Sequence, residues 1–329
     1  MKTVAKIVGG LVLLLVVVAA CGYGYLLFAF PKVPAPPNVK FDMSPERIAR
    51  GKYLNDHVVG CTTCHTQRDW GKFSGPVKEE VLGAGSESFN LGPAGKLYSK
   101  NITPAAIGSW TDGELLRAVT QGVSKDGTPL FPLMPYPHYG AMDEEDVHAV
   151  LAYIRTLKAI EGTAPDRQLN FPLNLIVRTI PRPNTFTKRP SPDDKVAYGK
   201  YMTTAALCGD CHTPSANGAP MPGMEFAGSV AGADNWEFVE TGYRVRAANI
   251  TPDANTGIGS WTEQQFIDKF KGFESATNTP LADHERAQNT VMPITAYAGM
   301  TREDLSAIYA YLRSLKPVTN RVEKFPDAK

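Results

Sequence analysis

The chain has 329 residues, with 34 lysines and arginines against 33 aspartates and glutamates, and its net charge of +1 gives no electrostatic basis for binding nucleic acid. Proline (26) and glycine (29) are frequent, which predicts much irregular backbone, while an apolar fraction of 43% is too high for a disordered chain. The length allows about two domains. The five cysteines are an odd number, so a framework made only of disulfides would leave one thiol over.

The N-terminal segment is long and apolar. Residues 7–30 are a run of 24 residues without a charge, preceded by Lys2 and Lys6. Such a run can cross a hydrocarbon core of about 30 Å as a helix, and the two lysines predict an N-terminus inside and the rest of the chain outside. We therefore expect a transmembrane anchor at 1–30 and an extended, proline-rich spacer at 31–43.

Two alternatives to an uncleaved anchor remain open. The sequence Val18-Ala19-Ala20-Cys21 resembles a bacterial lipobox, in which the cysteine is lipidated after cleavage, although the residues after Cys21 stay apolar. The other alternative is a secretion signal that is removed completely. All three place the rest of the chain outside the cytoplasm. The uncleaved anchor predicts a single-pass protein of the bacterial inner membrane with its remaining residues on the periplasmic side.

Three groups of residues occur twice in the same order, which indicates an internal repeat. We expect one domain at 44–160 and another at 191–318, with an interdomain strap at 161–190 and a C-terminal tail at 319–329. The paired groups are Ser44, Gly51, Tyr53 and Cys61 with Ser191, Gly199, Tyr201 and Cys208; Asn101, Pro104, Trp110 and Thr111 with Asn249, Pro252, Trp261 and Thr262; and Met134, Tyr139, Met142 and Asp146 with Met292, Tyr297, Met300 and Asp304.

Each repeat predicts an all-α order of helix, cysteine motif, loop, helix, loop and helix. Ser44 and Ser191, each followed by proline, suit the N-cap of the first helix. Thr111 and Thr262 open the middle helix with capping boxes. In the last helix, apolar residues have the spacing of one buried face, namely Val147, Val150, Leu151 and Ile154 in the first repeat and Leu305, Ile308, Tyr309 and Leu312 in the second. Three short helices make a thin core, so something else must fill each domain.

Four of the five cysteines form two Cys-x-x-Cys-His motifs, the attachment signature of c-type haem. Two thiols at this spacing reach two vinyl groups of the porphyrin, and the following histidine then lies under the iron. A zinc site would need two more ligands for each motif, and a redox dithiol would open a helix after a strand. The sequence predicts two covalent haem c groups, attached through Cys61, Cys64, Cys208 and Cys211, with His65 and His212 as iron ligands.

The second axial ligand of each iron is predicted to be a methionine. Met134 and Met292 each stand before a proline in a loop, where a rigid backbone can aim the sulfur at iron, and thioether ligation suits electron transfer. A methionine that fills a gap in the core is the structural alternative. His138 is a rival ligand for the first haem alone, because its repeat counterpart is Ala296.

A second pair of aligned methionines has a structural explanation. Met142 and Met300 directly precede Asp143 and Thr301, the expected N-caps of the last helices. A residue in that position packs onto the first turn of the helix as a hydrophobic staple. We therefore do not expect this pair to bind iron.

Each repeat resembles a class I cytochrome c domain, with an N-terminal helix, Cys-x-x-Cys-His, a loop methionine and a C-terminal helix. In that family a glycine of the first helix lets the last helix approach closely beside an aromatic residue. Gly51 with Tyr153, and Gly199 with Tyr311, match that arrangement. The resemblance implies two tandem cytochrome c domains behind an N-terminal transmembrane helix.

The motifs Asn101-Ile102-Thr103-Pro104, Gly108-Ser109-Trp110-Thr111 and Met134-Pro135, with their repeats, are similar to those of two groups. One group is the cytochrome subunit of membrane-bound alcohol, sorbitol and gluconate dehydrogenases. The other is the membrane-anchored dihaem cytochromes c of respiratory chains. The first group carries three haem motifs and is usually anchored at its C-terminus, which favours the second group.

These observations imply electron transfer rather than catalysis, because two haems with both axial positions filled exchange electrons but bind no substrate. The expected partners are a membrane respiratory complex or dehydrogenase on one side and an oxidase or soluble carrier on the other, with membrane lipid around the anchor and no nucleic acid. The alternative is a dihaem enzyme such as a cytochrome c peroxidase or a thiosulfate dehydrogenase. Such an enzyme would differentiate its two haems.

Overall fold

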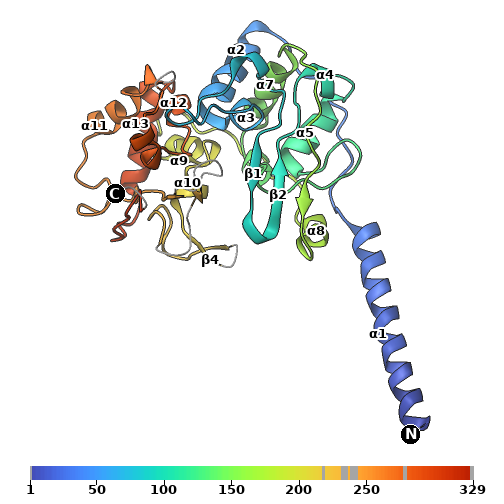
Figure 1. Cartoon of the computed structure of the whole chain (residues 1–329). Coiled ribbons are helices and arrows are strands. Elements are labelled where there is room, and N and C mark those ends of the chain that lie inside the picture. The colour runs from blue at the N-terminus through green and yellow to red at the C-terminus, as the bar shows by residue number, and fades with distance from the viewer. Residues whose placement is uncertain (1, 217–218, 231–235, 238–243, 277–279, 327–329) are drawn as a thin grey trace.

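The computed structural model describes residues 2–216, 219–230, 236–237, 244–276 and 280–326. Helices dominate this part and form two similar sets, blue to green and yellow to red in Figure 1. The first set contains α2 (Pro45–Leu54), the π-helix η1 (Asn55–Val59), α3 (Cys61–Cys64), α4 (Pro104–Ile107), α5 (Asp112–Gln121), α6 (Tyr136–Tyr139) and α7 (Glu144–Arg155). The second set contains α9 (Lys195–Ala205), α10 (Cys208–His212), α11 (Glu263–Lys271), α12 (Ile294–Tyr297) and α13 (Arg302–Ser314).

The first and last helices of each set cross in direct contact. Where α2 meets α7, a Cβ on Gly51 would lie 1.8 Å from the carbonyl oxygen of Ala149. Where α9 meets α13, a Cβ on Gly199 would lie 1.8 Å from the carbonyl oxygen of Ala307. Only glycine allows this approach of two backbones. The crossings confirm the close helix contact predicted for both glycines.

Side-chain caps fix the start of the middle and last helices. Thr111 and Thr262 each form the expected capping box at the start of α5 and α11. Asp143 and Thr301 cap α7 and α13, also as expected. Each cap satisfies backbone N–H groups that have no partner within the helix.

The predicted start of the second repeat's first helix is wrong. Ser44 does occupy the N-cap of α2, but Ser191 is not the N-cap of α9. Asp194 takes that position, and its carboxylate accepts a hydrogen bond from the backbone N–H of Ala197 at 3.0 Å. The Ser191 hydroxyl instead accepts a bond from the N–H of Asp193 in the preceding turn, at 3.3 Å. A carboxylate at a helix N-terminus also interacts favourably with the helix dipole, which explains the later start.

A small antiparallel sheet is added to the helical pattern. It has the order β1-β2-β3, formed by β1 (Ser88–Asn90), β2 (Gly95–Tyr98) and β3 (Gln168–Leu169), with Phe89 opposite Leu97 and Gly95 opposite Leu169. Two-residue ladders join β4 (Ser215–Ala216) to β5 (Ala219–Pro220) and β6 (Trp236–Glu237) to β7 (Arg244–Val245). Strands of two to four residues are too short to show an alternating pattern, so the all-α prediction did not contain them.

The segment between the two sets lies along the first set. Strand β3 joins the β1-β2 hairpin, and α8 (Leu173–Ile176) and the 3-10 helix η4 (Val177–Thr179) follow it. Further on, the N–H of Thr185 donates to the carbonyl of Gly140 at 2.8 Å, and Arg189 pairs with Asp146 at 2.7 Å. Residues 161–190 are thus held against the first set at several points.

The two helix sets contact each other reciprocally. Tyr201 of α9 donates its hydroxyl to Asp146 of α7 at 2.7 Å, and Tyr53 of α2 donates to Asp304 of α13. Each carboxylate also accepts a bond from the first helix of its own set. Because both aspartates are buried, their charges need these donors. The repeated Tyr53 and Tyr201 therefore join the two halves of the molecule, each of which contains one helix set.

Helix α1 (Lys2–Ala29) extends away from the rest of the molecule (Figure 1). Among the described helices it alone has the length and apolar composition needed to cross a membrane. Cys21 is exposed on this helix, which continues beyond it for eight residues.

Candidate functional site

Each Cys-x-x-Cys-His motif forms a short helix that starts after a residue in the left-handed conformation. Gly60 (φ +68°) precedes α3 and Leu207 (φ +58°) precedes α10. The two cysteines of a motif, three positions apart, lie on the same face of their helix. All four motif thiols are free. Burial raises the pKa of Cys61 and of Cys208 to about 12, so these thiols are protonated at neutral pH.

The two motif histidines have matching surroundings. Nδ1 of His65 lies 2.7 Å from the carbonyl oxygen of Lys100, and Nδ1 of His212 lies 2.7 Å from that of Ala248. A carbonyl only accepts hydrogen bonds, so each Nδ1 carries the proton and each Nε2 has a free lone pair for a metal. Burial lowers the pKa of both imidazoles and keeps them neutral.

Two asparagines hold the loops that provide these carbonyl groups. Asn101 accepts a hydrogen bond from the N–H of Thr103 at 2.8 Å and donates to the carbonyl of Ile160 at 2.8 Å. Asn249 accepts from Thr251 at 2.9 Å and donates to Val318 at 2.8 Å. Each asparagine thereby ties its loop to the segment after the last helix. The repeated Asn-Ile-Thr sequence orients the histidine indirectly, by fixing its hydrogen-bond acceptor.

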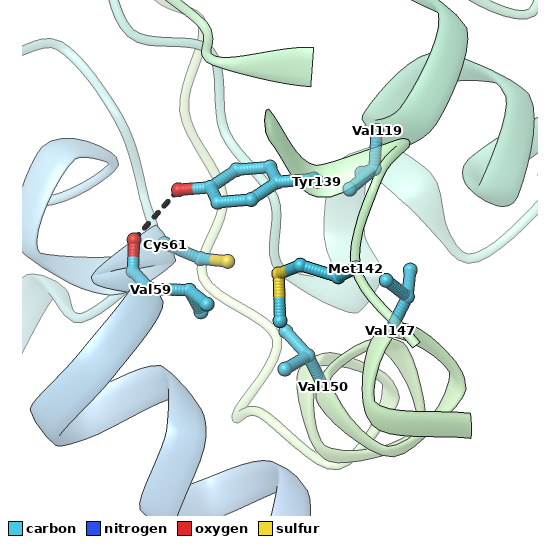
Figure 2. Close-up of a pocket in the computed structure, with 7 residues that line it drawn as sticks. All are labelled: Val59, Cys61, Val119, Tyr139, Met142, Val147 and Val150. Atoms are coloured by element: carbon cyan, nitrogen blue, oxygen red, sulfur yellow. Dashed lines mark hydrogen bonds between the residues drawn. The ribbon is translucent and has the colours of Figure 1, made fainter. Parts of the chain in front are cut away.

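A small apolar pocket lies beside Cys61 in the first half (Figure 2). The sulfurs of Cys61 and Met142 both point into the space between α3 and α7. Tyr139 crosses one side and donates its hydroxyl to the carbonyl of Val59 at 2.7 Å. The lining residues are Val59, Cys61, Val119, Tyr139, Met142, Val147 and Val150. Met142 and Val147 thus line the same pocket, as expected if Met142 packs onto the first turn of α7 as a hydrophobic staple.

The two predicted methionine ligands occupy equivalent turns directly before α6 and α12. The carbonyl of Met134 accepts a hydrogen bond from Tyr136 N–H at 2.8 Å, and that of Met292 accepts one from Ile294 N–H at 2.7 Å. Both residues are partly buried, and Met134 packs against the core cluster that also contacts Cys61. The two turns have the same hydrogen-bond pattern, as is expected if Met134 and Met292 have equivalent roles.

His138, the rival ligand, has a different partner. Its Nε2 lies 2.9 Å from the carboxylate of Asp210, which belongs to the motif of the other half. The imidazole therefore contributes to the contact between halves. This pair was not expected, because Asp210 occupies one of the two unspecified positions of Cys-x-x-Cys-His and the corresponding residue of the first motif is Thr63.

A loop of the first half holds the methionine loop of the second half. The N–H of Ser74 donates to the side chain of Asn289 at 2.8 Å, and its hydroxyl donates to the carbonyl of Met292 at 2.7 Å. Asn289 also donates to the carbonyl of Lys72 at 3.3 Å. Ser74 and Asn289 are buried. We call residues 69–75 together with Asn289 the clasp. The internal repeat does not predict the clasp, because neither Ser74 nor Asn289 is part of a repeated motif.

Comparison with known proteins identifies the second half. Residues 196–316 match the family model described as cytochrome c. This part of the chain is a cytochrome c domain. It contains the second Cys-x-x-Cys-His motif and Met292. A cytochrome c domain carries covalently attached haem c, and the free thiols and the neutral histidine described above fit that group. Among the described residues, no three His, Cys, Asp or Glu side chains are grouped to hold a metal ion on their own.

Relatives are similar to this chain well beyond the cytochrome c domain. The fructose dehydrogenase cytochrome subunit of Gluconobacter japonicus is 32% identical over 310 residues, which cover 88% of this chain and 57% of that protein. The alcohol dehydrogenase (quinone) cytochrome c subunit of Gluconacetobacter polyoxogenes is 30% identical over 299 residues, 84% of this chain and 58% of that protein. A diheme cytochrome c-type protein of Cereibacter sphaeroides is 25% identical over 164 residues, 47% of this chain and 53% of that protein.

The comparisons shift the preference between the two groups that the sequence resembles. The dehydrogenase subunits match most of this chain, whereas the dihaem cytochrome matches about half. The expectation that favoured dihaem respiratory cytochromes on the number of haem motifs is therefore weakened. The chain spans slightly less than three fifths of the length of these dehydrogenase relatives.

Proposed function

We propose that this chain carries two covalent haem c groups, one in each half, and transfers single electrons. The matching histidine setting supports this proposal, because Nδ1 lies 2.7 Å from a loop carbonyl in both halves. Residues 44–160 share that setting and the glycine helix crossing with the cytochrome c domain, although they lie outside the family match. Two tandem cytochrome c domains explain this similarity.

The chain's own residues attach and orient the cofactors. The thiols of Cys61 and Cys64, and of Cys208 and Cys211, form the thioether links. Each motif histidine presents its free Nε2 to the iron, with the ring orientation fixed at Nδ1. Met134 and Met292 are the proposed second axial ligands. Haem c supplies one-electron chemistry at its iron when bound.

The haem content of cysteine variants tests this function. The wild-type protein should contain two haems per chain in a pyridine haemochrome assay. Replacing Cys61→Ala together with Cys64→Ala should leave one, and so should the pair Cys208→Ala and Cys211→Ala. Cys21→Ala is the matched control and should keep both haems. One haem in the wild-type protein, or no loss in either double variant, would contradict the proposal.

The axial methionines are tested by spectroscopy. The oxidised protein should show the long-wavelength charge-transfer band of methionine–iron ligation. Met134→Ala with Met292→Ala should abolish it, because no other thioether replaces the missing ligands. The control pair Met142→Leu and Met300→Leu should retain the band, since these buried residues are assigned to packing. Persistence of the band in the first pair would exclude Met134 and Met292 as ligands.

The relatives and α1 support a proposal for partners and location. We infer that a membrane dehydrogenase or respiratory complex donates the electrons and that an oxidase or soluble carrier accepts them. Helix α1 anchors the chain in the bacterial inner membrane, with the haem-bearing halves on the periplasmic side. Purification in mild detergent should yield a stoichiometric dehydrogenase or respiratory subunit. The intact mass should include α1, whereas a mature N-terminus at Cys21 would support lipidation instead.

A dihaem peroxidase or thiosulfate dehydrogenase remains the functional alternative. Such enzymes differentiate their two haem sites, whereas the described histidine surroundings are equivalent here. Peroxide and thiosulfate turnover with an artificial redox partner should be negligible in the electron-transfer protein. Substantial turnover of either substrate would favour the enzyme.

A further inference from the structure

The last turn of α1 is fastened to the segment that follows β3. Nη2 of Arg178 donates to the carbonyl oxygens of Leu27 and Phe30, both at 3.0 Å, and its Nε donates to that of Leu26 at 3.3 Å. These are the terminal carbonyls that a helix cannot satisfy internally, and a cation also interacts favourably with that end of the helix dipole. Arg178 therefore sets α8 and η4 beside the end of α1.

If α1 spans a bilayer, the end of α1 beside Arg178 lies at the boundary of that bilayer. A helix of 28 residues is about 42 Å long, enough to cross the hydrocarbon core and reach the headgroups. Figure 1 shows α8 and the loop between β1 and β2 on the side of the molecule toward which α1 extends. The segment 171–176 is thus close to where the anchor leaves the membrane.

The same segment exposes large apolar side chains. Phe171 is 79% exposed, more than any other large apolar side chain that the structure describes outside α1, and Ile176 is 47% exposed. Exposed patches of this kind mark a surface that is covered by another phase or molecule. Phe28, in the last turn of α1, is 92% exposed as well.

The segment that carries the apolar patch, Phe171 and Ile176, is bonded to its neighbours and is not a free loop. Val177 is fully buried beneath it. Asn170 donates its backbone N–H to the carbonyl of Ala94 and its side-chain amide to the carbonyl of Pro93, both at 3.0 Å. The backbone of this segment is therefore tied to the β1-β2 loop at Asn170 and to the end of α1 at Arg178.

The charge around the patch is complementary to anionic lipid. Residues 167–182, the segment that contains the patch, have three basic side chains, Arg167, Arg178 and Arg182, and no aspartate or glutamate. Lys32 follows α1 directly. Basic side chains beside inserted apolar ones are typical of segments that lie in a membrane interface.

We propose that segment 171–176 is a second membrane contact, an interfacial turn that inserts Phe171 and Ile176 among the headgroups and upper acyl chains of an anionic bilayer. This proposal rests on the membrane anchor proposed for α1. Two attachment points restrict rotation of the haem-bearing halves about the proline-rich residues 31–43, so that the contact fixes which face they present along the membrane.

The test uses the full-length holoprotein in vesicles of phosphatidylethanolamine and phosphatidylglycerol. A nitroxide is attached to a single cysteine introduced by Phe171→Cys in a Cys21→Ser background, and the relaxation that the oxidised haems add is measured under nitrogen and subtracted. Collision with oxygen, which concentrates in lipid, is compared with collision with a water-soluble nickel chelate. Val196→Cys, an exposed apolar position on α9, is the matched control.

We expect a several-fold higher oxygen-to-nickel ratio at position 171 than at 196. Leu14→Cys reports α1 independently. If position 14 is in lipid and 171 matches the aqueous control, the second contact is overturned and the anchor stands. If position 14 is also aqueous, both proposals fail. Shielding of 171 that appears only in a complex with other subunits would identify a protein partner in place of lipid, and would also overturn the proposal.

Discussion

At the scale of single residues, backbone carbonyl groups control the chemistry and the packing. The motif histidines obtain their tautomer from the carbonyls of Lys100 and Ala248. The helix crossings depend on the carbonyl of Ala149 in one half and that of Ala307 in the other. No side chain at these acceptor positions is required for the contact, so the residue type there gives no information about it.

The glycine at a crossing predicts an unusual response to alanine. Gly→Ala in a helix ordinarily stabilises by about 1 kcal/mol, but a Cβ at Gly51 would overlap the carbonyl oxygen of Ala149. Gly51→Ala should lower the unfolding free energy by at least about 1–3 kcal/mol because α2 and α7 must separate. Gly10→Ala in α1, where a Cβ would meet no atom within 4 Å, is the control and should be tolerated. Denaturant unfolding followed by circular dichroism measures both.

Asp253 predicts a pH dependence of stability. Hydrogen bonds from Thr256 and Thr319 lower the pKa of its carboxyl to about 2. The pKa in the unfolded chain is about 3.9, so this contribution is present above about pH 4 and is lost as the pH falls to about 2. Urea midpoints between pH 2 and 5 should therefore fall less steeply for Asp253→Asn than for the wild type. Glu46→Gln, on the exposed face of α2, should show the wild-type slope.

At the scale of elements, the clasp makes the second methionine loop depend on the first half. Ser74 of the first half bonds both to Asn289 and to the carbonyl of Met292. Among the described hydrogen bonds, none joins Met134 to a residue of the second half. The two turns are locally alike but differ in what holds them. Unequal support is one means by which the two proposed haem sites would acquire different reduction potentials.

Removal of Asn289 should loosen the second methionine selectively. Asn289→Ala deletes the acceptor of the Ser74 N–H and leaves that buried donor unsatisfied, which costs about 1–3 kcal/mol. We expect about half of the methionine–iron charge-transfer intensity to be lost on mild heating, with the other half unchanged. Asn255→Ala, an exposed asparagine in the same half, is the control. Equal loss from both haems would show that the clasp has no specific role.

At the scale of the whole molecule, the reciprocal tyrosine–aspartate bonds join the halves into one unit. Tyr201 and Tyr53 each serve a buried carboxylate of the other half. The clasp adds further bonds between the halves, and His138 and Asp210 add another contact at the second Cys-x-x-Cys-His motif. The halves are therefore expected to unfold together.

Loss of both tyrosine hydroxyls should separate their unfolding. A hydrogen bond to a charged group contributes about 1.5–3 kcal/mol, so Tyr53→Phe with Tyr201→Phe should divide a single calorimetric transition into two. Tyr198→Phe is the matched control, because that hydroxyl serves Asp304 from within the same half, at 2.9 Å. It should lower the midpoint without dividing the transition. A single transition in the double variant would contradict this account of the interface.

The sequence by itself determined the local features that follow from the spacing of residues along the chain. These include the two cysteine motifs, the capping boxes at Thr111 and Thr262, the two glycine crossings and the apolar length of α1. Each depends on residues a few positions apart or on a repeated pattern, because local sterics and hydrogen bonding determine these features.

Only the tertiary structure decided which distant residues meet. Helix α9 begins after Asp194, the short sheet joins residues about 70 positions apart, and His138 pairs with Asp210. The clasp and the bond from Arg178 to the end of α1 are of the same kind. Such contacts use single polar groups without periodicity, and many end on backbone carbonyls that every residue provides, so the sequence carries no signal for them.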